Sequence, residues 1–490
     1  MKTLTVTALA LAWSLCANAQ KTFRDAYEAF KKNAQTEYDN FRDKANQQYA
    51  DFVRRVWEEY QLLPEVKQPK EEERPPVVMP EEDKGKPVED SPVPIEGVVA
   101  PPVPEPQPTP VAPIREQPQP VEQRVAFQIF GTDMSVRFDE SQRFSLPDCQ
   151  PESVARAWEQ MATEAYNNTI RDCLVIRLEH ELSDWAYLLV LQKMAEACMG
   201  KGNEATLFMA FVYCQSGYKM RLGLTGSRLY MLYASRHAIY DVGRFNVNDE
   251  TFYPFDCEEN HMQICGASFP DEKPLSLLIS QRQMLNYRPS ESRRLVSERY
   301  PDMVANVTVN LNLVDFYNTY PTSYIDGNIM TRWAMYANTP MEEGIRNSLY
   351  PALKEKIKGL SQQGAMERLL NWVQTAFVYE YDDKVWGDDR AFFAEESLYY
   401  PYCDCEDRSI LLSRLVRDLL GLKVILIYYP GHLAMAVNFT DAVKGDYIML
   451  DGSKYVVCDP TYIGAPVGMT MPDMDNETAR VILLENDVTE

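Results

Sequence analysis

Three residues that together can activate a thiol occur near the C-terminal end of the sequence. Cys405 comes just before an apolar run at helical spacing, Ile410 to Leu419, and Gly421 follows that run. His432 begins one apolar segment and Asp459 ends another. A thiol needs a base to take its proton, and the base needs an acceptor that fixes its tautomer. The pattern therefore predicts a nucleophile at 405, a base at 432 and an orienting carboxylate at 459.

The helix and strands predicted around these residues indicate how the three side chains come together. A helix is expected over 409–420, with strands over 423–429, 432–439 and 455–458. At the start of that helix, Cys405 would lie where the helix dipole favours a thiolate. Neighbouring strands would bring the imidazole of His432 and the carboxylate of Asp459 together.

Other interpretations of the same residues stay open. A lone cysteine near a helix start is often a small buried apolar side chain, and a lone histidine can belong to the core. Cys403 competes as nucleophile, although it precedes the helix and gains less from the dipole. Cys403, Cys405, Cys458 and His432 could also form a zinc site, but Cys-x-Cys is tighter than the usual spacing.

The sequence around these three residues resembles that of the transglutaminase-like branch of the papain-like cysteine enzymes. The motifs are Cys405-Glu406-Asp407-Arg408-Ser409, Gly431-His432-Leu433-Ala434 and Asp459-Pro460-Thr461, preceded by a helix and a tyrosine-containing segment over Glu367 to Tyr381. The resemblance covers residues 340–470. It implies an α+β fold, with a transglutaminase-like (papain-like) core of a helix and an antiparallel sheet.

The resemblance also implies a reaction and its participants. We expect thiol acyl transfer at amide bonds of a protein or peptide substrate, with hydrolysis of peptide or isopeptide bonds favoured. Tyr402 and Trp386 are the candidates for an additional oxyanion or substrate contact, and no metal or organic cofactor is implied. A lysine amine as acceptor would make a crosslinking transglutaminase. A non-catalytic protein that binds peptides or surface material is the alternative of a different class.

The N-terminus and the composition restrict the cellular setting. Residues 1–19 have the parts of a secretory signal peptide with cleavage after Ala19, which predicts an exported, periplasmic or secreted protein. The net charge of −23 argues against nucleic acid and anionic membranes as partners. No later run is long enough to form a transmembrane segment. An exported chain can form disulfides, and Cys257 with Cys265 is a plausible pair.

Residues 20–63 carry an eleven-residue repeat that predicts one long amphipathic helix. Tyr27, Tyr38, Tyr49 and Tyr60 recur at the same position of each unit and would form a nearly straight stripe. A long aromatic stripe is unfavourable when it is exposed to water. Residues 23–63 should therefore dock on this chain or mediate self-association. The proline-rich residues 64–123 predict a disordered linker.

The globular part should contain two related units. Residues 124–275 begin with a predicted hairpin, and a shift of 204 residues lays Gly217 over Gly421 and Arg228 over His432. With Lys201 at the cysteine position, this first unit would be a degenerate, inactive transglutaminase-like copy. Residues 276–335 are expected to be a β-rich connection that includes a strand over 303–316. Residues 336–490 should be the catalytic domain.

Overall fold

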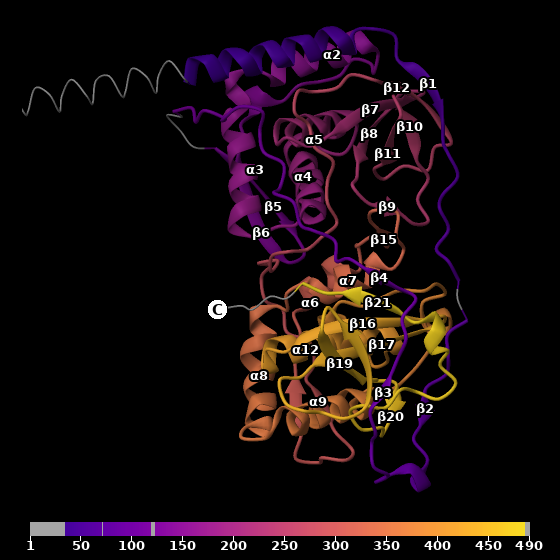
Figure 1. The fold of residues 1–490 in the computed structure, drawn as a ribbon. Coiled ribbons are helices and arrows are strands. Elements are labelled where there is room, and N and C mark those ends of the chain that lie inside the picture. Colours follow the sequence, from indigo (N-terminus) through magenta and orange to yellow (C-terminus); the bar gives the residue numbers. More distant parts are fainter. Residues whose placement is uncertain (1–34, 71, 119–122, 486–490) are drawn as a thin grey trace, which may run out of the picture.

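The computed structural model describes residues 35–70, 72–118 and 123–485, which form a mixed α+β protein (Figure 1). Two sheets lie one in each half of the molecule, each with helices beside it. The predicted signal peptide and the first repeat unit fall outside the described residues. Within the described ranges, no helix has the length and apolar character that crossing a membrane needs.

The first half is built on a six-stranded sheet with the order β1-β12-β7-β8-β11-β10. Its strands are β1 (Glu58–Gln61), β7 (Met220–Thr225), β8 (Arg228–Ala234), β10 (Phe245–Val247), β11 (Glu250–Pro254) and β12 (His261–Cys265). The helices are α2 (Pro151–Met161), α3 (Asn167–Glu179), α4 (Asp184–Met199) and α5 (Asn203–Gln215). The predicted hairpin forms as β5 (Arg124–Ile129) and β6 (Thr132–Arg137), with short helices η2 (Glu140–Gln142) and η3 (Glu164–Tyr166) after it.

The second half is built on a seven-stranded sheet with the order β3-β18-β19-β17-β16-β21-β4. The strands of its centre are β16 (Lys423–Tyr429), β17 (His432–Asn438), β18 (Asp446–Leu450), β19 (Ser453–Cys458) and β21 (Arg480–Leu483). The helices are α8 (Glu343–Ile357), α9 (Gln362–Ala376), α10 (Asp382–Val385), α11 (Ala394–Tyr399) and α12 (Cys405–Leu420), with η4 (Asn476–Thr478) near the end. The sequence predictions for the helix after Cys405 and for the three strands are therefore confirmed.

The same order of elements occurs in both halves. In the first half, α4 and α5 precede strands that pair in the order β12-β7-β8-β11-β10. In the second half, α9 and α12 precede strands that pair in the order β21-β16-β17-β19-β18, and all these pairings are antiparallel in both sheets. This repetition is what a duplicated unit would produce.

The N-terminal helix is shorter than the repeat predicts. Helical residues extend over 35–53, and residues 58–61 form β1, which pairs with the edge strand β12. Tyr49 is buried against Trp158, with ring centroids 4.3 Å apart, whereas Tyr38 and Phe41 remain exposed. The helix docks on its own chain through one face. The prediction of a helix to residue 63 is wrong because the open edge of β12 offers backbone partners that a helix would leave unused.

The proline-rich segment is ordered, against the prediction of a disordered linker. Its strands β2 (Val77–Val78), β3 (Ser91–Pro92) and β4 (Gly97–Val99) pair in parallel with β20 (Tyr462–Ile463), β18 and β21. A short helix, η1 (Glu81–Asp83), lies between them. Figure 1 shows this segment passing from the first half along the second. Proline is tolerated here because the added strands lie at sheet edges.

The connecting region is mixed rather than β-rich. It contains β13 (Arg293–Val296), β14 (Val304–Val307), α6 (Leu311–Tyr317), β15 (Ser323–Tyr324), which pairs with β9 (Ala238–Ile239), and α7 (Thr331–Asn338). The strand predicted over 303–316 breaks at Asn310, whose side chain accepts from the Asn312 N–H and caps α6.

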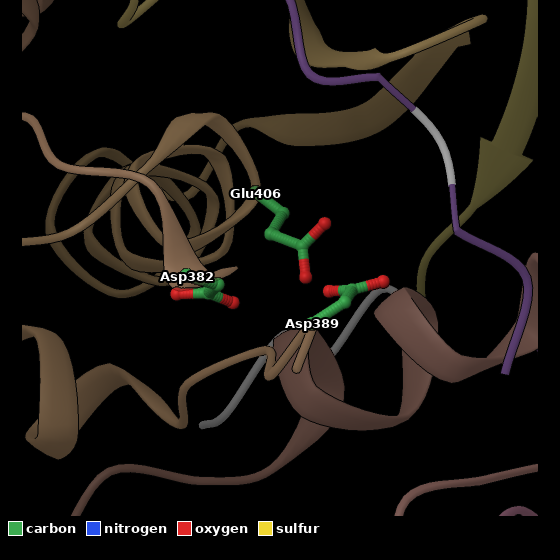
Figure 2. Close-up of side chains that lie close together, drawn as sticks. All are labelled: Asp382, Asp389 and Glu406. Atoms are coloured by element: carbon green, nitrogen blue, oxygen red, sulfur yellow. The ribbon is translucent and has the colours of Figure 1, made fainter. Parts of the chain in front are cut away.

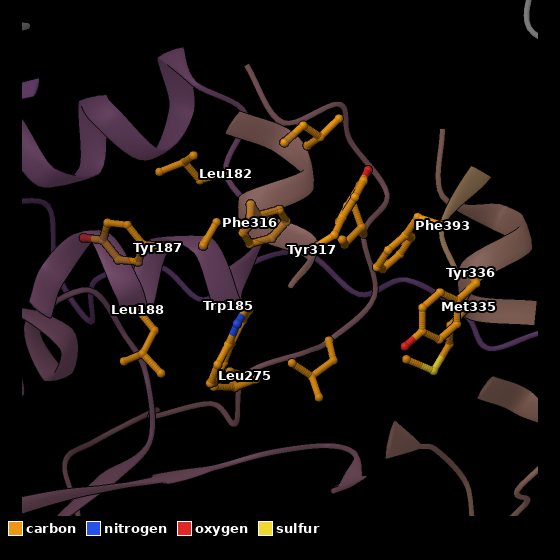
Figure 3. Packing of buried hydrophobic residues seen from close by; sticks show 14 of the residues in the cluster. Leu182, Trp185, Tyr187, Leu188, Leu275, Phe316, Tyr317, Met335, Tyr336 and Phe393 are labelled. Carbon is orange, nitrogen blue, oxygen red and sulfur yellow. The ribbon is translucent and has the colours of Figure 1, made fainter. Parts of the chain in front are cut away.

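Aromatic side chains from this region join the two halves. Tyr317 of α6 stacks on Phe393 with centroids 4.0 Å apart, and Tyr336 of α7 lies 4.4 Å from the same ring. Figure 3 shows these rings on one side of the buried cluster and Trp185 and Leu188 of α4 on the other, with Phe316 between them. One buried apolar cluster extends through both halves, so they are held together by a shared core.

Candidate active site

Cys405 is the first residue of α12 because Asp404 caps the helix. The Asp404 carboxylate accepts from the N–H groups of Glu406 and Asp407, and the Asp407 side chain reaches back to the N–H of Asp404. This reciprocal arrangement satisfies backbone donors that have no partner within the helix. The other end of α12 is closed by Gly421 at a φ of 64°, a left-handed conformation that glycine adopts without strain.

His432 and Asp459 meet across two adjacent strands. The β16–β17 hairpin turns at Pro430-Gly431, so His432 begins β17, while Asp459 follows the end of β19, which pairs with β17. His432 Nε2 lies 2.9 Å from Asp459 Oδ2, and both side chains are buried. The other ring nitrogen, Nδ1, is buried without a hydrogen-bond partner. The bond to Asp459 fixes the ring, and Nδ1 remains available for proton transfer.

Cys405 and His432 line one cavity of about 530 Å³ at the junction of α12 and the hairpin. Charged side chains from several elements form much of its wall, with Trp333 and Tyr428 as an aromatic side. Their rings stack with centroids 5.2 Å apart. Cys403, the competing nucleophile, is buried and is not among the lining residues. The geometry therefore favours Cys405 over Cys403.

The two further residues that the sequence suggested do not line this cavity. Tyr402 forms a backbone bridge with Val378. Trp386 packs edge-on against Tyr400, with centroids 4.9 Å apart, and under the guanidinium of Arg390. Both side chains are half-buried outside the cavity lining, so their expected contact with a reacting group is not present in this conformation.

Tyr379 is another aromatic residue near the thiol that the sequence reasoning did not single out; it is not among the cavity-lining residues either, but its hydroxyl lies close enough to Cys405 and Asp404 to be affected by their charges. It lies within the tyrosine-containing segment before Cys405, and its hydroxyl is 3.5 Å from the carbonyl oxygen of Arg74. Burial raises the pKa of the Tyr379 hydroxyl, and the nearby charges of Cys405 and Asp404 raise it further. This residue keeps its proton and can donate a hydrogen bond. The sequence signal that could have identified Tyr379 was its place in the tyrosine-containing segment before Cys405.

The environment of Cys405 opposes ionisation, against the expectation from the helix dipole. Burial raises the pKa of the Cys405 thiol well above its ordinary value, and the carboxylates of Asp404, Glu406 and Glu73 raise it further. A hydrogen bond from the Leu433 backbone acts in the opposite direction. The dipole argument fails here because desolvation and like charges outweigh the partial charge at a helix end.

A group of carboxylates lies beside the thiol. Figure 2 shows Asp382, Asp389 and Glu406 pointing toward one another, and Asp404 and Asp407 form a second group with Asp382. Burial, and then the charge of Glu406, raise the pKa of Asp382 to about 8. A guanidinium partly balances this charge, since the Arg332 side chain lies 2.7 Å from Asp389 and 3.5 Å from Glu406.

These carboxylates are the residues that could hold a hard cation such as Ca²⁺ or Mg²⁺. The Trp333 indole N–H already donates to Glu406 at 3.0 Å, and the raised pKa of Asp382 favours its protonated form. Among the described residues, the cysteine and histidine set considered for zinc does not form a group of converging ligands. All nine cysteines in the described ranges are free, so the suggested Cys257–Cys265 pair does not form.

The first half has a counterpart of this site with different residues. Asn203 begins α5 and its Oδ1 accepts from the Leu229 N–H at 2.9 Å, as Cys405 interacts with the Leu433 N–H. Arg228 begins β8, in the place of His432. Phe255 donates to Met231 across the sheet, so the next residue, Asp256, corresponds to Asp459. The cysteine position is thus Asn203 rather than Lys201.

Comparisons with family models, with curated proteins and with solved structures find no match for this chain. Any functional conclusion therefore depends on the residues and the geometry of the site.

Proposed function

We propose that this protein is a transglutaminase-like cysteine enzyme that transfers the acyl group of an amide to the Cys405 thiol. The observation that carries the proposal is the His432–Asp459 bond of 2.9 Å, which orients an imidazole whose other nitrogen is unpartnered beside the cavity that Cys405 lines. A thiol, an imidazole and a carboxylate in this order are the parts that activate a cysteine nucleophile.

The proposed reaction has two halves. Cys405 Sγ attacks the amide carbonyl carbon while its proton passes to His432 Nδ1, and His432 then protonates the departing nitrogen as the C–N bond breaks. The acyl group remains on sulfur as a thioester. A water molecule or an amine then attacks the thioester, gives a proton to His432, and the sulfur leaves and regains that proton.

The oxyanion formed in each half needs hydrogen-bond donors. The Cys405 N–H is a natural donor because it lies at the start of a helix, where backbone N–H groups lack partners within the helix. Tyr379 supports a second contact, since its hydroxyl already lies 3.5 Å from a carbonyl oxygen, that of Arg74. We prefer Tyr379 to Tyr402 and Trp386 for this role.

The test is cleavage of peptide anilides by the full chain. We expect Cys405→Ala to abolish release of the aniline, while the matched variant Cys403→Ala, which removes a cysteine two residues away and outside the cavity, retains it. Equal activity in the wild type and in Cys405→Ala would refute the proposal.

The charge of the cavity favours a second acyl acceptor beside water. Acidic side chains outnumber basic ones in its lining: Lys70 pairs with Asp388 and Arg332 with Asp389, while Asp383, Glu72, Glu73 and Glu406 add further carboxylates. A cationic amine would be drawn toward such a wall. Crosslinking to a lysine side chain is therefore a candidate function. Incorporation of a fluorescent alkylamine into casein, compared with release of the free acid, separates amine transfer from hydrolysis.

A non-catalytic binding protein is the candidate of another class, and the raised pKa of the Cys405 thiol favours it. Iodoacetamide distinguishes the two. An enzyme should label at Cys405 faster than at the other cysteines once the cavity is open, whereas a binding protein should show an ordinary or slower thiol. We also propose that the chain is exported, on the basis of residues 1–19; N-terminal sequencing of the secreted protein, expected to begin at Gln20, tests this.

A further inference from the structure

Part of the proline-rich segment forms one wall of the cavity. Pro69, Lys70, Glu72, Glu73 and Pro75 are among the lining residues, together with Cys405 and His432. We refer to residues 72–75 as the strap. Just before it, the Gln68 side chain donates to the Asp389 carbonyl at 2.9 Å, and just after it, β2 pairs with β20. The strap is therefore anchored on both sides of the site.

The strap binds the hairpin turn next to His432 through its main chain. The Arg74 N–H donates to the carbonyl of Gly431 at 2.9 Å. The Arg74 side chain donates to the carbonyls of Pro430, at 3.1 Å, and Asp473, at 2.8 Å. Its own carbonyl lies beside the Tyr379 hydroxyl. These are the contacts that an extended peptide makes with an open backbone edge.

The fit at Gly431 is close. Gly431 has a φ of 74°, and a Cβ built on it would lie 2.2 Å from the carbonyl oxygen of Glu72. Only glycine permits both the backbone conformation and this approach. The turn that positions His432 is thus shaped to receive a main chain at this point.

The side chain of Glu73 reaches the acidic wall of the cavity. It accepts a hydrogen bond from the Asp382 backbone, while burial and the charges of Asp389 and Asp383 raise the pKa of Glu73 to about 7. Its charge also raises the pKa of Cys405. Glu73 is therefore the least favourable part of the strap, and Arg74 with the main-chain contacts holds it in place.

We propose that the groove over Cys405 binds an extended polypeptide main chain, and that the strap fills this groove as a bound peptide would. The inference rests on the proposed function, and it names its substrate class as extended peptide rather than a small amide. An incoming peptide pairs its N–H with the Gly431 carbonyl and presents a carbonyl to Tyr379. It must displace the strap before it reaches the thiol. A neutral or cationic residue at the place of Glu73 favours that exchange.

The test measures alkylation of Cys405 in the full-length protein by iodoacetamide at fixed pH, with peptide mass spectrometry as readout. Arg74→Ala removes the side-chain contacts to Pro430 and Asp473, so we expect labelling to rise by about tenfold or more as the open fraction grows. Lys454→Ala is the matched control. It removes an anchor of the same segment, the 2.6 Å ion pair between Lys454 of β19 and Asp90, the residue before the edge strand β3, and should leave the rate unchanged.

A second variant and a peptide complete the test. Gln68→Ala, which removes the side-chain anchor of the strap on the Asp389 carbonyl, should also raise the labelling rate, and it keeps the test valid if Arg74→Ala does not fold. A synthetic peptide with the sequence of residues 68–78 should slow labelling of Arg74→Ala again. Wild-type labelling rates in both variants, or a peptide without effect on labelling, would overturn the proposal.

This readout needs no turnover, so the two proposals fail separately. Faster labelling in Arg74→Ala without any anilide cleavage supports the filled groove and refutes the proposed function. Anilide cleavage by the wild type with labelling unchanged in both strap variants refutes the filled groove and leaves the enzyme.

Discussion

The sulfur of Cys405 is subject to opposing influences within a few residues. It begins a helix, which favours a thiolate, yet burial and the carboxylates of Asp404, Glu406 and Glu73 raise its pKa. In the proposed reaction His432, which lies 2.9 Å from Asp459, is the base that overcomes this by taking the proton during attack. The sequence indicated the three residues because their types and order carry the chemistry. Asp404 and Glu406 flank Cys405 in the sequence, but the sequence could not indicate that they are buried beside the thiol or that Glu73 approaches from a distant segment.

Asp459→Asn should reduce kcat/KM for a peptide anilide by on the order of 10²–10⁴-fold, because the amide cannot hold the imidazole in the same tautomer or stabilise its charge. Asp459 acts through His432 and is a positioning residue, so the pH profile of kcat/KM should also shift. Asp256→Asn, the corresponding change in the first half, is the control and should leave the rate unaltered. A wild-type rate and pH profile in Asp459→Asn would contradict this assignment.

Asp382 should make stability depend on pH. Its pKa is about 8 in the fold against an ordinary value of 3.8, so between these values the folded state holds a proton that the unfolded state has lost. The free energy of unfolding then falls as pH rises from 4 to 8, by at most about 6 kcal/mol at ~1.4 kcal/mol per pKa unit. Urea titrations should show that Asp382→Asn removes much of this slope and exposed Asp441→Asn does not. An unchanged slope in Asp382→Asn would rule out this origin.

At the scale of elements, the sequence predicted helices and strands correctly where apolar residues recur at the spacing of a single helix or strand. α12, β16, β17 and β19 were predicted because apolar spacing and the Gly421 and Pro430-Gly431 stops are local signals. β1 to β4 were missed because they exist only by pairing with distant strand edges. The proline-rich composition of this segment does not indicate which distant strands it pairs with.

Asp404 offers a test of how α12 presents its first residue. Burial, and then the charges of Asp382 and Glu73, raise the pKa of the Asp404 carboxyl. Asp404→Asn keeps the cap and removes this costly charge, so it should not destabilise the protein, while the pKa of Cys405 falls. Asp404→Ala removes both and should destabilise the protein by about 1 kcal/mol. Urea denaturation gives the stabilities, and the pH profile of alkylation gives the pKa. Equal stability of the Asn and Ala variants would show that the cap contributes nothing.

At the scale of the whole molecule, the N-terminal segment ties the two halves together. It pairs with β12 through β1, crosses the cavity, adds strands to the second sheet and returns to the first half, where the Arg177 side chain donates to the Pro108 carbonyl at 2.9 Å. The repeated order of strands fits the predicted duplication, in which the first half carries Asn203 and Arg228 where the second carries Cys405 and His432. We expect the first half to support the fold rather than the reaction.

A break in this segment should leave the molecule assembled. A site for a specific protease, inserted in the exposed turn between Lys84 and Gly85, should be cut without separating the fragments, since strands on both sides of the break stay paired. Size-exclusion chromatography of the cut protein should give one peak that contains both fragments. Elution of the fragments in separate peaks would contradict a continuous wrapping of the second sheet.

The central claim is that the Cys405 sulfur carries the acyl group of an amide substrate. It is tested most directly by intact-mass and peptide mass spectrometry of Arg74→Ala, quenched in acid during turnover of a peptide anilide. We predict an acyl adduct on Cys405 that is retained when Cys403 is also changed to Ala and lost when Cys405 is. Absence of an adduct, or an adduct on another residue, would contradict the account.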